Sequence, residues 1–304
     1  MKRKITFLAL VLCLIFPALS HANNLLNQKF MATATVEDVE REIRNGADVN
    51  ARNEHGWTAL MFAAQFSTNP KIIISLVRNG ADVHARDENG VTALMCAAYN
   101  NTNPEIITTL VKKGADVNAR IKDGYTALMA AAENNTNPKI ITSLVRNGAD
   151  VNARIEGGTT ALMFAARSTT NPKIITSLVR NGADVNARGE GGTTALMFAA
   201  MFNTNPEIIT TLVRDGADVH ARGEDGTTAL MAAAYGNTNS EIINALLENG
   251  ASPRLVNDEG KTAFDYAKEN EALKNTEAYW RLNELRYGNP TKPKGFFDKI
   301  RELF

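Results

Sequence analysis

The sequence holds few of the residues that build reactive or cross-linked sites. Among its 304 residues there are two cysteines, Cys13 and Cys96. Cys13 lies in an expected N-terminal leader, and the one cysteine that would remain excludes an internal disulfide and a cysteine-rich zinc site. The four histidines, His21, His55, His84 and His220, do not have the spacing of metal ligands. We therefore expect no metal.

The sequence also lacks an excess of charge of one sign. Its 33 lysines and arginines balance 33 aspartates and glutamates, whereas nucleic-acid binders usually carry a basic excess. We found no phosphate-binding loop, dinucleotide-binding glycine fingerprint, metalloprotease helix motif or Gly-x-Ser-x-Gly turn. These absences argue against a nucleic-acid partner, a small-molecule cofactor and catalysis.

The long apolar run is confined to the N-terminus. Lys2, Arg3 and Lys4 precede an apolar stretch over residues 5–16, and small residues stand at Ser20 and Ala22. This pattern is typical of a secretory signal peptide over residues 1–22, cleaved after Ala22. A membrane anchor is the alternative, but twelve apolar residues are too few to cross ~30 Å of hydrocarbon as a helix. We expect export to a bacterial periplasm, with secretion from the cell as the alternative.

A period of 34 residues runs through the rest of the chain. It appears in a series of glycines, each followed by one residue and then Thr-Ala: Gly56, Gly90, Gly124, Gly158, Gly192, Gly226 and Gly260. A second glycine series, from Gly46 to Gly250, keeps the same spacing. A fixed period of this length indicates a solenoid of stacked repeats.

Residues 90–123 serve as an example of the pattern within a repeat. The dipeptide before and at the tip glycine, such as Asn89-Gly90, suits a tight hairpin turn. A short alanine-rich helix is expected over residues 92–98. A second helix is expected to begin at Asn103-Pro104, where Asn caps and Pro occupies the first turn, and to end at Gly114.

The order G-x-T-A-L-M-x-A-A followed by I-I-x-x-L-V-x-x-G-A-D-V-N-A resembles the ankyrin repeat over about residues 30–286. Two features depart from the family pattern. Thr-Ala-Leu-Met, as in residues 58–61, replaces the usual Thr-Pro-Leu-His, and the loop between the helices is one residue longer. The resemblance implies an all-α solenoid of helix-turn-helix units with β-hairpin tips.

The tip glycines divide the chain into six full internal repeats between two capping units. After the signal peptide (1–22), the repeat domain (23–287) comprises an N-terminal cap (24–55), repeats 56–89, 90–123, 124–157, 158–191, 192–225 and 226–259, and a C-terminal cap (260–287). The N-terminal cap is expected to contain a helix over residues 36–44. The polar composition of both caps suits the ends of a solenoid.

Residues 288–304 form a linker and a short amphipathic tail. Its apolar residues share one side of a predicted helix: Phe296, Phe297, Ile300, Leu303 and Phe304. Three interpretations remain open: the tail covers the end of the stack, docks in a partner's groove, or contacts a membrane weakly.

Several repeated residues are expected to be structural. The methionine row is interpreted as core: Met61, Met95, Met129, Met163, Met197 and Met231. Cys96 is expected to be a buried, inert thiol, and His84 and His220 to occupy a turn position held by Asn in other repeats.

Two rows of opposite charge follow the tips. Arginines stand at Arg52, Arg86, Arg120, Arg154, Arg188 and Arg222, and glutamates at Glu54, Glu88, Glu156, Glu190 and Glu224, with Lys122 as the exception. We expect the rows to compensate each other at the surface. The alternative is a charged ridge that steers a partner.

Positions that vary between repeats match the surface by which ankyrin proteins usually bind, the concave side made of tips and first helices. Several of them are aromatic, and exposed aromatics are typical of binding hot spots. The candidate protein-binding residues are Glu54, His55, Trp57, Gln65, Phe66, Glu88, Tyr99, Asn100, Tyr125, Glu133, Arg167, Phe202 and Tyr235. Their clustering favours the N-terminal half, around Trp57, Phe66, Tyr99 and Tyr125. Drift at unconstrained surface positions is the alternative.

The sequence thus predicts a non-catalytic protein-interaction scaffold in the periplasm, binding a partner protein through this face. The alternative is a secreted effector that binds a host protein through the same face.

Overall fold

The computed structural model of the chain describes residues 23–287. The expected leader (1–22) and tail (288–304) lie outside the described residues. Two compact units are present. The first holds the chain up to Ala131 together with Lys139–Asp150, and the second holds Ala132–Pro138 together with the chain from Val151 onward.

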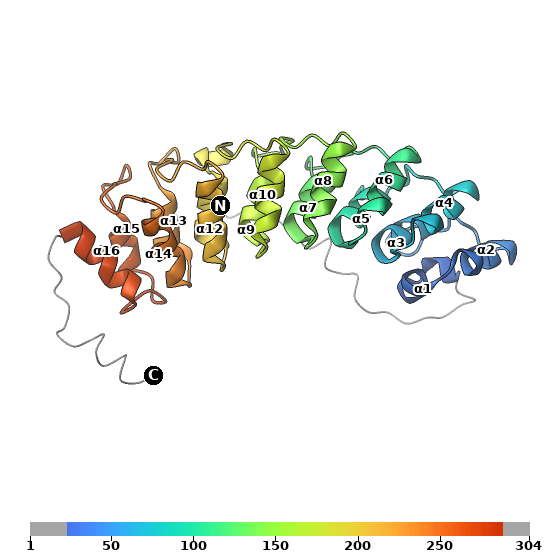
Figure 1. The fold of residues 1–304 in the computed structure, drawn as a ribbon, viewed down its shortest axis with the longest axis horizontal. Helices are drawn as coiled ribbons and strands as arrows, with labels where there is room; N and C mark the ends of the chain where they lie inside the picture. The colour runs from blue at the N-terminus through green and yellow to red at the C-terminus, as the bar shows by residue number, and fades with distance from the viewer. Residues whose placement is uncertain (1–22, 288–304) are drawn as a thin grey trace. The chain divides into compact units, whose positions relative to one another are not determined.

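The described residues form sixteen α-helices and two short 3-10 helices, with no strand (Figure 1). The N-terminal cap contains η1 (Asn24–Leu26), α1 (Gln28–Thr33) and α2 (Val36–Arg44). The first helices of the repeats are α3 (Ala59–Phe66), α5 (Ala93–Asn100), α7 (Ala127–Asn134), α9 (Ala161–Ser168), α11 (Ala195–Phe202) and α13 (Ala229–Gly236). The second helices are α4 (Pro70–Arg78), α6 (Pro104–Lys112), α8 (Pro138–Arg146), α10 (Pro172–Arg180), α12 (Pro206–Arg214) and α14 (Ser240–Glu248). The C-terminal cap contains α15 (Ala263–Ala267) and α16 (Glu277–Tyr287), and η2 (Glu190–Gly192) forms one tip.

Local sequence sets the ends of these helices. The Thr92 side chain accepts a hydrogen bond from the Met95 amide and caps α5, and Asn103 caps α6 with Pro104 in the first turn. Gly114 ends α6 with a φ of 104°, and the next amide, that of Ala115, donates to the Leu110 carbonyl. This is the left-handed helix ending that glycine allows.

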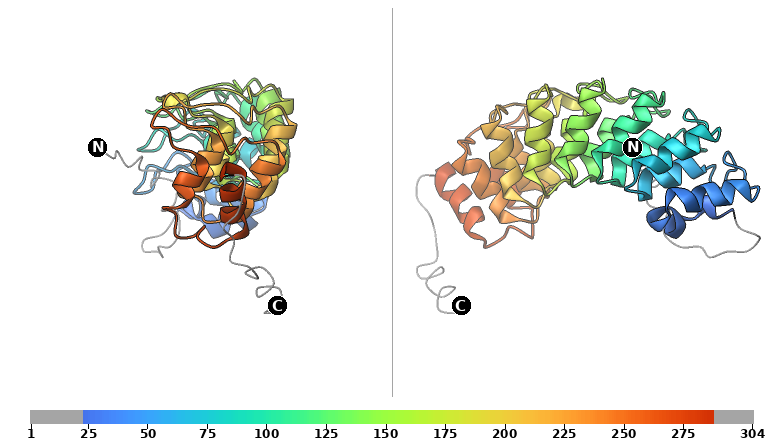
Figure 2. Two further views of the ribbon diagram at one scale, coloured as in Figure 1. Left: turned by 90° about the vertical axis from the view of Figure 1, so that its left-hand side faces the viewer. Right: turned by 45° about the vertical axis from the view of Figure 1, so that its right-hand side comes forward.

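The core lies within and between neighbouring repeats of each unit. Within a unit, first helices contact first helices, as α9 and α13 both contact α11, and second helices contact second helices, as α4 contacts α6. The isoleucine pair of each second helix is fully buried, and the six methionines of the row are at most 6% exposed, which confirms their role in the core. Figure 2 shows the helix pairs from two further sides.

The tips are tight turns rather than strand pairs. In the first, the Asn53 amide donates to the Trp57 carbonyl and the Gly56 amide donates to the Asn53 carbonyl. The expected β-hairpin is reduced to isolated antiparallel bridges, Arg52 to Thr58, Arg86 to Thr92 and Arg154 to Thr160. The turn is too short for a longer ladder before the N-cap threonine starts the helix.

The connection between the two helices of a repeat joins it to the repeat before. The buried Asn203 amide group donates to the carbonyls of Ala166 and Thr169, at 2.9 and 2.8 Å, and Asn205 donates to the Thr170 carbonyl. Asn101 and Asn237 make the equivalent pairs of bonds. These inward-turned asparagines give the longer inter-helix loop its structural role.

A second set of asparagines joins each repeat to the next one. Asn118 donates to the Gly148 carbonyl and accepts from the Asp150 amide, and Asn50, Asn152 and Asn186 make the two equivalent bonds from their own repeats. His84 and His220 stand at this position and form no such bridge. These histidines are therefore turn residues, and the two junctions at which they stand lack the asparagine bonds to the next repeat.

The C-terminal cap is closed by a polar cluster at the start of α15. Thr262 and Asp265 form a reciprocal capping box, and Arg286 from α16 donates to both side chains. Lys268 forms an ion pair with Asp265 at 2.8 Å. The cluster fixes α16 against the last short helix.

Candidate functional site

The candidate site is the surface made by the tips and the exposed positions of the first helices, which we call the tip-and-first-helix surface. Its residues come from two short stretches of each repeat, the turn around the tip glycine and the last turn of the first helix. Because these positions differ from repeat to repeat, each unit presents its own side chains there.

The structure sorts the thirteen predicted residues into three groups. Six are exposed: Glu54, His55, Glu88, Asn100, Phe202 and Tyr235. Five are partly buried: Gln65, Phe66, Tyr99, Glu133 and Arg167. Two are buried: Trp57 and Tyr125. The expectation that Trp57 and Tyr125 line the surface is therefore wrong.

Trp57 is buried because it packs inside its own repeat and reaches the next tip. Its ring meets the Phe62 ring edge-on, with centroids 5.2 Å apart, and its Nε1 donates to Asp87 at 3.2 Å. The side chain is 9% exposed. Trp57 thus stabilises the first repeat and its junction with the second rather than presenting a ring to solvent.

Tyr125 is also buried. It is 6% exposed in the repeat that carries alanine at position 130, where Phe62 stands in the first repeat. Ala130 itself is 1% exposed. In this repeat a large residue after the tip glycine accompanies a small one in the helix, whereas the first repeat has large residues at both positions.

In the second unit, large aromatic side chains do reach the surface. Phe202 of α11 is 51% exposed and Tyr235 of α13 is 60% exposed. The ring of Tyr235 also meets that of Tyr266 edge-on, with centroids 5.8 Å apart. Glu133 and Arg167 lie 3.9 Å apart as an ion pair on the same surface. The expected preference for the N-terminal repeats is not supported by exposure.

The two charged rows do not pair with each other. Instead the arginines donate to main-chain carbonyls one period further on: Arg52 to Arg86 at 2.6 Å, Arg188 to Arg222 at 2.6 Å and Arg222 to Val256 at 2.6 Å. Among residues 23–287, Glu88, Glu156, Glu190 and Glu224 form no ion pair, and Glu54 meets only His55. The expected compensation through ion pairs is therefore wrong, and we call the exposed glutamates of each unit its acidic edge.

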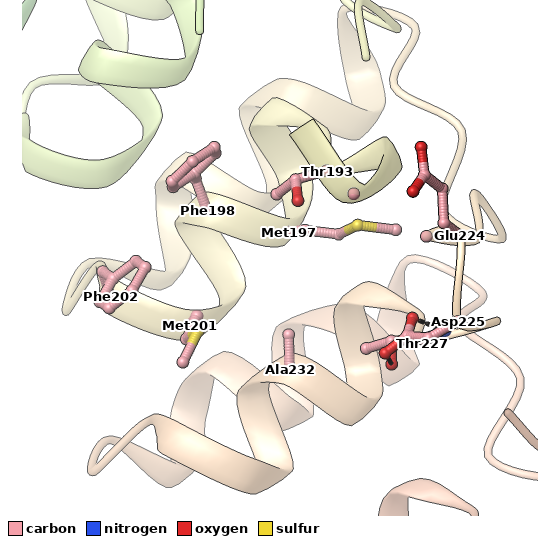
Figure 3. A pocket seen from close by; sticks show the side chains of 11 residues that line it. Thr193, Met197, Phe198, Met201, Phe202, Glu224, Asp225, Thr227 and Ala232 are labelled. Atoms are coloured by element: carbon pink, nitrogen blue, oxygen red, sulfur yellow. Dashed lines mark hydrogen bonds between the residues drawn. The ribbon is translucent and has the colours of Figure 1, made fainter. Parts of the chain in front are cut away.

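A pocket of about 540 Å³ opens on the surface of the second unit (Figure 3). Its apolar side is formed by Met197, Phe198, Met201 and Phe202 of α11 and by Ala232 of α13. Glu224 and Asp225 line the opposite end from Phe202. The volume falls within the range of roughly 300–1,000 Å³ usual for ligand sites.

Sequence reasoning assigned only Phe202 of this pocket to the site. A signal was present in the comparison of repeats. In four of them a large aromatic residue stands after the tip glycine, five residues later, or at both positions, in the pairs Trp57/Phe62, Tyr125/Ala130, Thr159/Phe164 and Thr193/Phe198, and a fifth has the mid-sized pair Val91/Cys96. The sixth has Thr227 and Ala232, which are both small, and the pocket opens there.

The charge at the pocket is held negative by local hydrogen bonds. The Thr227 amide and hydroxyl both donate to Asp225, at 2.9 and 2.8 Å, and these bonds lower the pKa of the Asp225 carboxyl below its usual value. The two charged residues of the lining, Glu224 and Asp225, are both acidic.

Among the described residues, no three His, Cys, Asp or Glu side chains lie together as metal ligands would. Within the same residues, no helix has the length and apolar character to cross a membrane. Cys96 is buried at 2% exposure.

Comparison with protein families gives a match along most of the described chain. Residues 30–121, 118–189 and 196–279 match the family model described as ankyrin repeats (3 copies). Residues 166–213 match a second one described as ankyrin repeats (many copies). A search of curated proteins finds no match.

Proposed function

Because the chain belongs to the ankyrin repeat family, whose repeats generally mediate protein–protein interaction, we propose that it is a non-catalytic scaffold that binds a partner protein through the tip-and-first-helix surface. The supporting observation is the exposure of Phe202 and Tyr235 on the neighbouring helices α11 and α13. Large aromatic rings cost free energy when they face water, and they contribute strongly when a partner covers them.

The scaffold acts by rigid presentation. Within the second unit, each repeat is tied to its neighbour by buried asparagine bonds and by arginine–carbonyl bonds. A surface held in place before binding loses little conformational entropy when the partner docks. This property suits a chain that offers several repeats to one partner.

The proposed compartment is the bacterial periplasm. The support is the sequence of residues 1–22, with its basic start, apolar stretch and small residues before Asn23. Mass spectrometry of the protein from cell fractions tests this proposal. We expect a periplasmic form that begins at Asn23, and an uncleaved chain would contradict it. Recovery from the medium would instead favour the secreted effector.

Binding is tested by capture with two baits from a periplasmic extract. One bait is the native protein, and the other carries Phe202→Ala and Tyr235→Ala, which remove exposed rings and leave the core unchanged. A third bait with Val256→Ala and Leu285→Ala, exposed apolar residues outside the first helices, is the matched control. We expect a protein held by the native and control baits and lost by the double variant, with hydrogen exchange of the complex slowed in α11 and α13. Equal capture by all three baits would overturn the assignment of the surface.

A further inference from the structure

The pocket of the second unit combines an apolar side with an acidic end. Phe202, half exposed, and Met201 lie at one end of α11, and Glu224 and Asp225 lie at the other end of the pocket (Figure 3). Among residues 23–287, no basic side chain lines it. A ligand that fills it must therefore bring apolar surface and positive charge together.

The pocket exists because two positions are small in the same repeat. Ala232 lines it and is partly exposed, whereas Phe164 at the equivalent position is 3% exposed in its own repeat. Thr227 stands where Trp57 and Tyr125 stand in other repeats. Gly236 leaves room for the Met201 side chain, because a Cβ at position 236 would lie 3.3 Å from it.

The negative charge at the rim extends beyond the pocket. Glu190 on the preceding tip is exposed and forms no ion pair among the described residues. The nearby guanidinium groups keep their positive charge, and each is bonded to a main-chain carbonyl, Arg188 to that of Arg222 and Arg222 to that of Val256. The charged side chains that line the pocket among the described residues are the carboxylates of Glu224 and Asp225, and they favour lysine or arginine over an acidic ligand.

We propose that this pocket binds a segment of a partner protein in which a large apolar side chain stands close to lysine or arginine residues. The apolar side chain lies against Met197, Met201 and Phe202, and the basic group lies at Glu224. This inference rests on the proposed function and specifies the chemistry of the partner. A flexible methionine pair suits the site because thioethers adapt to different apolar shapes.

The test uses the purified protein and three fluorescent ten-residue peptides. The first places a phenylalanine and a leucine between two pairs of lysines. The second replaces the phenylalanine and leucine by serine, and the third replaces the lysines by glutamate. Fluorescence anisotropy measures affinity. Methyl signals of ¹³C-labelled methionine locate the site, since Met197 and Met201 line it while Met61 and Met95 lie in the first unit.

We expect only the first peptide to bind and to shift the signals of Met197 and Met201. Phe202→Ala should weaken binding about tenfold, as for a hot-spot residue, and Glu224→Gln about fivefold through lost charge attraction. The matched controls are Phe66→Ala and Glu88→Gln, which change the same positions in the first repeat and should leave affinity within about twofold.

A filling variant gives an independent measurement. Ala232→Phe introduces the residue that three other repeats carry at this position, so the repeat should fold, and circular dichroism checks this. We expect it to abolish binding of the first peptide.

Three outcomes would overturn the inference. The first is that the glutamate peptide binds as well as the lysine peptide. The second is that the lysine peptide shifts the signals of Met61 or Met95 in place of those of Met197 and Met201. The third is that a variant of the protein that ends at Tyr287 has shifted Met197 and Met201 signals even without peptide. The last would make the chain's own residues 288–304 the occupant. A partner that slows exchange in α11 and α13 while the peptides fail would leave the proposed function standing. If no partner protects these helices, the proposed function fails.

Discussion

At the scale of the residue, one substitution between repeats decides whether a link is made. Asn118 bridges to the Gly148 carbonyl and the Asp150 amide, and His84 at the equivalent position makes neither bond. The backbone around both residues follows the same turn, since each has its amide bonded to the aspartate two residues earlier. The difference therefore lies in the side chain alone.

We expect His84→Asn to stabilise the protein. The new amide would meet the Gly114 carbonyl and the Asp116 amide, and two exposed hydrogen bonds should raise the free energy of unfolding by about 1 kcal/mol. Urea unfolding followed by circular dichroism measures it. Asn118→His is the reciprocal variant and should lower stability by a similar amount. An unchanged midpoint for both variants would show that these bonds contribute nothing.

The residue scale is also where the sequence was least informative. The position after the tip glycine varies, and variation suggested a surface, yet Trp57 is buried against Phe62. Whether this position faces solvent depends on the size of the residue five places later and of those in the next tip. A pattern taken from one repeat carries no information on that packing.

At the scale of the element, sequence and structure agree closely. The helix expected over residues 36–44 is α2 (Val36–Arg44), and the second helix of the typical repeat begins at Pro104 as its Asn-Pro pair predicts. Caps and helix endings are local, so they can be predicted from neighbouring residues. The links between elements could not be predicted, because Asn203 and Arg188 have partners some 34 residues away.

Asn203→Ala should destabilise the second unit. The variant removes donors to two buried carbonyls and the acceptor of the Asn205 amide. Leaving buried polar groups unpaired should cost about 2–4 kcal/mol. Thermal unfolding measures the loss, and Thr204→Ala, an exposed neighbour in the same loop, is the control expected to change little. Equal effects from both variants would contradict the role assigned to the buried asparagine.

The C-terminal cap should lose stability in acid. Burial alone would raise the pKa of Asp265, but bonds from Lys268, the Thr262 amide and Arg286 outweigh it and hold the pKa well below the usual 3.8. Because the folded pKa is lowered, the stabilisation is complete above about pH 5 and is lost as the pH falls through 3.8 and below.

Asp265→Asn tests this pH dependence. We expect it to lower the free energy of unfolding by about 1–2 kcal/mol at pH 7, the usual cost of losing a cap. At pH 3 the gap between the variant and the native protein should narrow, as measured by thermal unfolding at each pH. Asp258→Asn, on an exposed tip, is the matched control. A gap that stays constant with pH would exclude Asp265 as the titrating group.

At the scale of the whole molecule, net charge conceals an ordered distribution. The chain is neutral overall, and its tips carry exposed arginines bonded to carbonyls beside Glu88, Glu156, Glu190 and Glu224, which are exposed and form no ion pair among the described residues. Charges that project into solvent steer an approaching partner, and salt screens them over a Debye length of about 8 Å at physiological ionic strength.

The association rate of the lysine-flanked peptide should therefore fall with salt. We expect a drop of about tenfold between 50 and 500 mM salt, with little change in the dissociation rate. Stopped-flow fluorescence measures both rates. Glu190→Gln with Glu224→Gln should flatten the dependence, whereas Glu54→Gln with Glu88→Gln should not. A salt-independent association rate would rule out steering by the acidic edge.

The arginine–carbonyl bonds have a consequence for how the number of repeats can change. These bonds reach a partner in the adjacent repeat, at a separation of 34 for Arg52 and Arg86. Residues 136–154 and 170–188 are identical letter for letter. A crossover that aligned these two stretches would add or remove 34 residues and leave each arginine–carbonyl bond with a partner. A change of array length by one period would thus keep the bonds between repeats and alter the number of tips offered to a partner.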